Sequence, residues 1–161
     1  MSKVDEALAD PSLTSEERAN LELVVMFRGL PFSARSKYTI DGFCPVRMGM
    51  ANLAVINGVT GPGYRADSIP DRSDEITAII AHKDWVWATW TIRGTHLGEL
   101  YGIPATGRTI EVTEVGQWRI RDGLIAEAWF MVDELALVHQ LGLWPGTGNQ
   151  ANASTGTTEE R

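Results

Sequence analysis

The feature of this chain that most constrains its fold is a β-hairpin pattern over residues 109–133. Two runs rich in β-branched and aromatic residues, 109–121 and 124–133, flank the dipeptide Asp122-Gly123. Asp-Gly favours the two-residue turn of antiparallel hairpins, because both positions tolerate the positive φ that this turn requires. The pattern therefore predicts two paired strands in the last third of the chain.

A third strand is predicted over residues 85–96, where side chains alternate between two faces. One face carries Val86, Ala88, Trp90 and Ile92. Residues 76–81 are also β-rich, and Lys83-Asp84 between these two runs indicates a turn. Consecutive strands with short turns predict an antiparallel sheet.

The N-terminal part of the chain contains one clear helix signal. Thr14-Ser15-Glu16-Glu17 supplies a capping hydroxyl and first-turn carboxylates, and Gly29 ends the apolar run that follows. We expect residues 1–13 to form a flexible arm, 14–145 a single domain, and 146–161 a disordered tail. Helices followed by several strands predict an α+β fold, with the helices on one side of a curved antiparallel sheet.

Composition excludes several function classes. The 161 residues include 14 Lys and Arg against 21 Asp and Glu, a net charge of −7 that argues against binding to nucleic acid. A single cysteine, Cys44, and three histidines exclude a thiolate-rich metal site. We find neither an N-terminal secretory signal nor an apolar run long enough to span a membrane, so a cytoplasmic location is expected.

Asp133 is the first candidate catalytic residue. It follows the apolar run 128–132, and a carboxylate in apolar surroundings has a raised pKa suited to proton transfer. Counting back by twos along the strand places Met131 and Trp129 on the same face, a composition typical of a pocket wall. The alternative is that Asp133 ends the strand at the surface or caps the next turn.

Three further polar residues are candidates. His96 follows a strand and could relay protons, or it could be a hydrogen-bonded structural group. Glu114 could lie in the pocket, or it could pair across strands with Arg93 or Arg119. Asn52 could donate a hydrogen bond to an enolate oxygen, or it could cap a helix.

Tryptophan is unusually frequent, with six in the chain. Trp90, Trp118 and Trp129 lie on the predicted strands. Indole rings stack on aromatic substrates, but the same rings can equally form the hydrophobic core.

An ordered set of short motifs covers the segment from Gly94 to Leu143. The motifs are GTHLG at 94–98, GIPATGR at 102–108, WRI at 118–120, DG at 122–123, IAEAW at 125–129, Asp133, and QLG at 140–142. In their order and spacing they resemble the SnoaL-like polyketide (ester) cyclases of the NTF2-like superfamily.

The resemblance implies a cone-shaped α+β barrel, in which a curved antiparallel sheet wraps over N-terminal helices and encloses a deep apolar pocket. It further implies a dimer or higher homo-oligomer, chemistry that uses no cofactor, and a general acid/base role for Asp133 in an intramolecular aldol closure. These cyclases often carry a histidine in the strand that residues 109–121 match, where this chain has Glu114 and Gly116.

The leading hypothesis is an enzyme that performs aldol-type proton transfer, as a cyclase or retro-aldol lyase, on an aromatic or polyketide-like small molecule. Asp133 would abstract the proton, His96 would orient it, and Asn52 or an indole would bind the oxyanion. The expected substrate-binding residues are Glu114, Trp118, Trp129, Met131, Asn52 and Trp90. Two alternatives remain: a non-catalytic binding or assembly module, and a dehydratase, isomerase or epoxide hydrolase.

Overall fold

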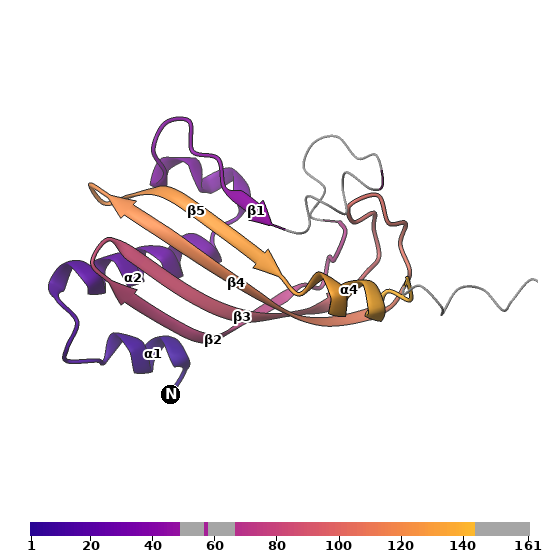
Figure 1. The fold of residues 1–161 in the computed structure, drawn as a ribbon, viewed down its shortest axis with the longest axis horizontal. Coiled ribbons are helices and arrows are strands. Elements are labelled where there is room, and N and C mark those ends of the chain that lie inside the picture. The colour runs from indigo at the N-terminus through magenta and orange to yellow at the C-terminus, as the bar shows by residue number, and fades with distance from the viewer. Residues whose placement is uncertain (49–56, 58–66, 144–161) are drawn as a thin grey trace, which may run out of the picture.

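The computed structural model describes residues 1–48, 57 and 67–143 (Figure 1). A curved five-stranded sheet carries helices at its two ends (Figure 1). The elements in chain order are α1 Lys3–Leu8, α2 Ser15–Gly29, two 3-10 turns η1 Phe32–Ala34 and η2 Ser36–Tyr38, β1 Val46–Met48, β2 Ser73–His82, β3 Trp85–Thr95, β4 Thr109–Arg121, β5 Leu124–Val132 and α4 Glu134–Gln140. No helix within these described ranges is long and apolar enough to cross a membrane.

The sheet has the strand order β1-β5-β4-β3-β2. Strands β2 to β5 form an antiparallel meander, as predicted, whereas β1 pairs with β5 in parallel and makes the sheet mixed. The predicted hairpin between β4 and β5 is confirmed: Asp122 and Gly123 both have positive φ, 52° and 74°. Lys83, in the turn between β2 and β3, also has a positive φ.

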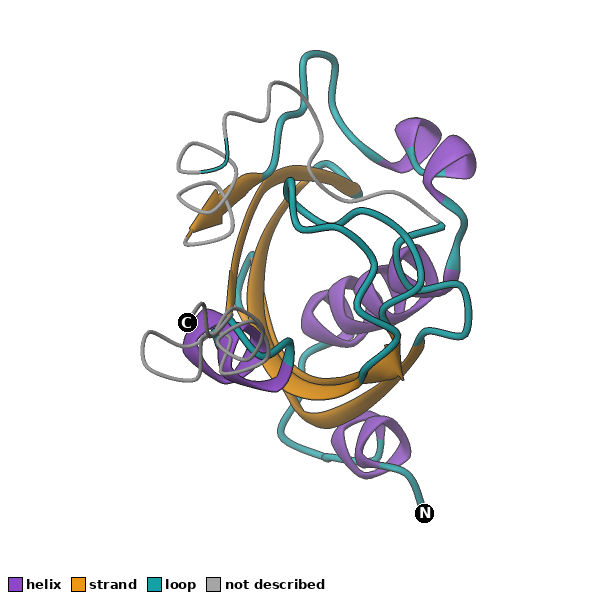
Figure 2. Ribbon diagram, turned by 90° about the vertical axis from the view of Figure 1, so that its right-hand side faces the viewer, coloured by secondary structure: helices purple, strands orange, loops and turns teal. Residues whose placement is uncertain are grey.

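Helix α2 lies on the concave side of the sheet (Figure 2). It begins at the predicted position, because the Thr14 hydroxyl accepts from the Glu17 N–H and the Glu17 carboxylate accepts from the Thr14 N–H. Its buried apolar residues, Leu21, Val24 and Phe27, recur at helical spacing and join the core. The end of this helix therefore lies over the open interior of the curved sheet.

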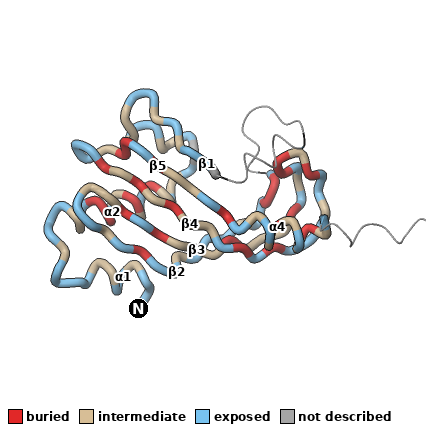
Figure 3. Tube along the Cα trace, viewed as in Figure 1, coloured by how far each residue is buried: buried red, intermediate tan, exposed pale blue. Residues whose placement is uncertain are grey.

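Burial alternates along the central strands (Figure 3). The predicted inner face of β3, with Val86, Ala88, Trp90 and Ile92, is buried throughout. On β4 the side chains on the same face as Glu114 are also buried, including Val112, Trp118 and Ile120. Period-two alternation correctly identified the inner face of both strands.

Two parts of the chain differ from expectation. Lys3–Leu8 form α1 rather than a flexible arm, because Ser2 and Asp5 make a capping box and Val4, Ala7 and Leu8 pack against the core. Val46–Met48 form β1, a strand that the sequence patterns did not predict, and residues 49–56 lie outside the described residues. The predicted disordered tail, 146–161, also lies outside them.

Gly116 tests how tightly the concave face is packed. A Cβ at this position would lie 2.8 Å from both the Trp90 and the Phe130 ring, whereas a Cβ at Gly29 would meet nothing within 4 Å. We expect Gly116→Ala to lower the free energy of unfolding by ~1–3 kcal/mol through overpacking. The matched control Gly29→Ala should be neutral or stabilising by up to ~1 kcal/mol. Urea denaturation of both variants measures this, and equal effects would contradict the packing argument.

Candidate active site

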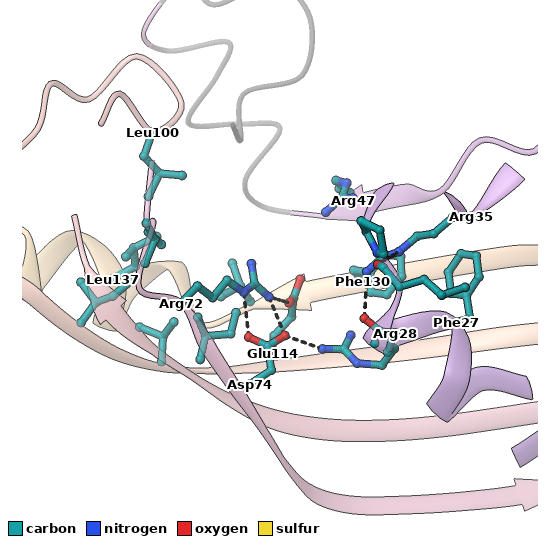
Figure 4. Close-up of a pocket in the computed structure, with 18 of the residues that line it drawn as sticks. Phe27, Arg28, Arg35, Arg47, Arg72, Asp74, Leu100, Glu114, Phe130 and Leu137 are labelled. Carbon is teal, nitrogen blue, oxygen red and sulfur yellow. Dashed lines mark hydrogen bonds and ion pairs between the residues drawn. The ribbon is translucent and has the colours of Figure 1, made fainter. Parts of the chain in front are cut away.

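A cavity of about 480 Å³ opens between the C-terminal end of α2 and the concave face of the sheet (Figure 4). Its described lining is Phe27, Arg28, Gly29, Leu30, Pro31, Arg35, Arg47, Ile69, Arg72, Asp74, Ile92, Leu100, Tyr101, Ile110, Val112, Glu114, Trp118, Phe130, Val132 and Leu137. Most of these side chains are apolar or aromatic, and the charged ones gather at one end. This volume and composition are typical of a small-molecule site.

An aromatic cluster forms one wall. The rings of Trp118 and Phe130 meet edge to face at 5.4 Å between centroids, and Trp90 lies behind them, 6.0 Å from Trp118. Gly116 lies against the Trp90 and Phe130 rings, and because it has no side chain these rings can pack directly on the strand. Neither indole Nε1 has a hydrogen-bond partner among the described residues.

Arg28, at the end of α2, is fixed by two kinds of contact. Its guanidinium lies 3.4 Å from the centroid of the Trp90 ring and donates to Asp74 at 2.7 Å. Burial lowers the pKa of Arg28 to about 10, although Asp74 and Glu114 act in the opposite direction. Arg28 therefore remains charged at neutral pH.

Asp74, on β2, bridges Arg28 and Arg72. Arg72 donates to both Asp74 oxygens, at 2.7 and 2.9 Å, in the bidentate geometry that guanidinium and carboxylate favour. The three side chains form an Arg28–Asp74–Arg72 network at the edge of the cavity (Figure 4).

Glu114 projects from the middle of β4 into the cavity. Its carboxylate lies 3.7 Å from the Arg72 guanidinium, and its side chain is 13% exposed. Burial raises the pKa of Glu114, and the opposing attraction of Arg72, Arg28 and Arg47 does not cancel this effect. Glu114 thus has the property that sequence analysis sought in Asp133.

Two further arginines complete the charged end. Arg35 donates to the backbone carbonyls of Leu30 and Arg28, at 2.9 Å each. Arg47, on β1, lies 5.4 Å from the centroid of the Phe130 ring. Parallel pairing of β1 with β5 sets Arg47 opposite Phe130 and so brings its side chain to the cavity.

The structure places the predicted site residues in different environments. Glu114 and Trp118 line the cavity, and Trp90 supports it from behind. Trp129 and Met131 are absent from the described lining, and Met131 is 46% exposed. Asn52 lies outside the described residues.

The predicted position of Asp133 in the pocket wall is wrong. Asp133 is exposed and caps α4, where its side chain accepts from the Ala136 N–H at 2.9 Å. The inner face of β5 carries Phe130 and Val132, so counting back by twos from Asp133 follows the outer face instead. The surface alternative considered in the sequence analysis describes this residue.

His96 is fully buried but is not among the residues that line the cavity. Its Nδ1 lies 3.1 Å from the Thr106 hydroxyl, and burial lowers its pKa. The structure therefore does not bring His96 and Asp133 together at the cavity.

Sequence reasoning missed the arginines. Three of the four arginines in the described lining, Arg35, Arg47 and Arg72, come from residues 32–75, whose Arg- and Asp-rich composition was the available signal. That segment has no regular hydrophobic period, so its side chains could not be assigned to a face.

Strands β2 to β5 lie in a segment that is similar to known proteins. Residues 65–141 match the family described as SnoaL-like polyketide cyclase. This segment is SnoaL-like. It contains β2 to β5, α4 and, within the cavity, Arg72, Asp74 and Glu114. The family resemblance stated from the sequence motifs is thereby confirmed.

Two curated relatives are similar over a shorter stretch. The aklanonic acid methyl ester cyclases DnrD of Streptomyces peucetius and DauD of Streptomyces sp. (strain C5) are each 40% identical over 62 residues, 38% of this chain. The match spans 43% of DnrD and 38% of DauD.

Solved structures extend the likeness to the whole fold. AclR from Streptomyces galilaeus aligns with a TM-score of 0.61 at 24% identity, over 83% of this chain and 85% of AclR. A SnoaL-like protein from Jannaschia sp. CCS1 aligns with a TM-score of 0.67 at 17% identity, over 84% of this chain and 100% of that one. The predicted NTF2-like α+β fold is confirmed.

The raised pKa of Glu114 predicts a pH-dependent effect on stability. Glu114 keeps its proton to a higher pH in the folded protein than in the unfolded chain. Its contribution to the free energy of unfolding is therefore most favourable at low pH. That contribution is lost as pH rises from the unfolded pKa, ~4.3, through the raised folded pKa.

Gln cannot ionise, so the Tm of Glu114→Gln relative to wild type should be higher at pH 7 than at pH 4. Differential scanning calorimetry at both pH values measures this. Glu22→Gln, on the exposed side of α2, controls for the loss of one negative charge. If the Tm of Glu114→Gln relative to wild type is instead lower at pH 7 than at pH 4, the surroundings stabilise the ionised carboxylate and the argument from burial is wrong.

Proposed function

We propose that this protein catalyses cofactor-free aldol-type proton transfer on a polyketide-like small molecule bound in the cavity, with Glu114 as the general acid/base. The observation that carries the proposal is a buried carboxyl group of raised pKa in the wall of an aromatic cavity, beside Arg72. SnoaL-like similarity and the names of DnrD and DauD support the reaction class.

A raised pKa makes Glu114 a stronger base than an exposed glutamate and moves its titration toward neutral pH. General acid/base groups work best when their pKa lies near the operating pH. The Arg72 contact acts in the opposite direction and favours the ionised form. The same residue could therefore both take and return a proton.

The proposed reaction has three steps. The Glu114 carboxylate removes a proton from a carbon next to a substrate carbonyl, leaving an enolate. The enolate carbon attacks a second carbonyl of the same molecule, so a C–C bond forms and the attacked oxygen becomes an alkoxide. Protonated Glu114 then returns its proton to the alkoxide, and no atom or electron is gained or lost.

Negative charge develops on oxygen during these steps, and two groups could bind it. Arg72 lies 3.7 Å from Glu114, so an enolate oxygen beside the base would also lie close to a guanidinium. The Trp118 indole lines the cavity and its Nε1 has no hydrogen-bond partner in the described part of the chain, but this atom is buried, so it could donate only after the ring shifts. The two groups would supply the role that sequence analysis gave to Asn52 or an indole.

The proposal moves the general base from Asp133 to Glu114. Asp133 is exposed and already accepts the hydrogen bond that caps α4. Glu114 occupies the strand in which the cyclases often carry a histidine. A carboxylate in that strand can perform the same proton transfer.

Paired substitutions separate the two carboxylates. With aklanonic acid methyl ester as the first substrate tested, Glu114→Gln should lower kcat/KM ~10²–10⁴-fold, the loss expected for a general base. Asp133→Asn should change kcat/KM by less than ~10-fold, because Asn caps helices about as well as Asp. Chromatography of the cyclised product measures both. The reverse ranking would return the role to Asp133.

Product analysis also separates this proposal from a non-catalytic binding module. In that case wild type and Glu114→Gln would bind the substrate equally and neither would convert it. Exchange of the substrate's acidic C–H for deuterium, followed by NMR in D2O, detects proton abstraction even when ring closure is slow.

A further inference from the structure

The cavity carries an excess of positive charge in an acidic protein. Its described lining contains four arginines, Arg28, Arg35, Arg47 and Arg72, and two carboxyl groups, Asp74 and Glu114, a formal excess of two positive charges. The whole chain has a net charge of −7. Positive charge is therefore concentrated where a ligand would bind.

The arginines do not all have the same surroundings. Arg28 and Arg72 share Asp74, and Arg72 also approaches Glu114. Arg47 has neither a hydrogen bond nor an ion pair to any residue in the described ranges, and its guanidinium lies over the Phe130 ring instead. Arg47 thus presents its N–H donors beside an aromatic wall.

Like charges at this end of the cavity repel one another. After burial, the next causes of the lowered pKa of Arg35 are the neighbouring charges of Arg47 and Arg72. An anion between these side chains would relieve that repulsion. A neutral ligand group at the same place would not.

We propose that the ligand of this cavity carries a free carboxylate, which Arg47 binds, with the aromatic body of the ligand against Trp118 and Phe130. Carboxylate matches the planar guanidinium fork and accepts two parallel hydrogen bonds from it. DnrD and DauD are named for a methyl ester, in which the carboxyl group has no charge. The inference therefore predicts that this protein binds a free acid more tightly than the corresponding methyl ester.

The inference deepens the proposed function, because it assumes that the cavity is the substrate site. It does not depend on Glu114 as a base. Ligand binding can be measured with molecules that contain no acidic C–H, so charge recognition and catalysis are tested separately.

Isothermal titration calorimetry with 2-naphthoate, methyl 2-naphthoate and 2-naphthamide tests the preference. The three ligands share one ring system and differ in charge. We expect 2-naphthoate to bind at least about tenfold more tightly than either neutral ligand, the fold-change typical of a charge-assisted hydrogen bond. Equal affinities for the acid and the neutral ligands would overturn the inference.

Substitutions identify the residue responsible. Arg47→Gln should weaken 2-naphthoate binding about tenfold and leave 2-naphthamide within about twofold, and Arg47→Lys should give an intermediate loss because it keeps the charge but not the fork. Arg121→Gln removes the same charge at an exposed site outside the described lining and should leave both affinities unchanged. Thermal melts monitored by circular dichroism verify that each variant is folded.

Two results would refute the role of Arg47. Equal weakening by Arg47→Gln and Arg121→Gln would attribute the preference to net charge. Equal weakening of naphthoate and naphthamide by Arg47→Gln would attribute it to packing. Full cyclase activity in Glu114→Gln, combined with an Arg47-dependent preference for the acid, would instead overturn the proposed function and leave this inference standing.

Discussion

The Arg28–Asp74–Arg72 network is the interaction on which the site depends. A buried guanidinium is tolerated only when it is paired and solvated by other groups. Arg28 meets this condition with Asp74 on one side and the Trp90 ring on the other. Because Arg28 lies in the last turn of α2 and Asp74 lies on β2, their ion pair holds the end of the helix over the edge of the sheet. The cavity is the space enclosed beneath that contact.

Local signals in the sequence were sufficient for most of the meander. The Asp122-Gly123 turn and the alternation along β3 and β4 depend on neighbouring residues, so they could be identified before the strands were paired. The same alternation placed Glu114 on the inner face. Its pKa could not be predicted, because that depends on burial by α2 and on arginines distant in the chain.

Sequence patterns did not predict the position of side chains at the end of a strand or in segments without a regular hydrophobic period. Alternation placed Asp133 on one face of β5 with Met131, but it could not show which face is the inner one, so the predicted pocket position of Asp133 was wrong. Arg47 reaches the cavity through parallel pairing of a three-residue strand with β5. A contact between residues more than eighty positions apart leaves no local pattern, and the charged half of the site therefore became visible only in the folded structure.

The contrast between an acidic chain and its cationic cavity also has a kinetic consequence. An anion approaching from solution first meets the repulsive field of a molecule with net charge −7, and only near the opening does it meet the arginines. At low ionic strength the distant repulsion reaches ~30 Å and slows encounter. Added salt would screen that barrier more than the short-range attraction, so capture of an acidic ligand could become faster even as the complex becomes weaker.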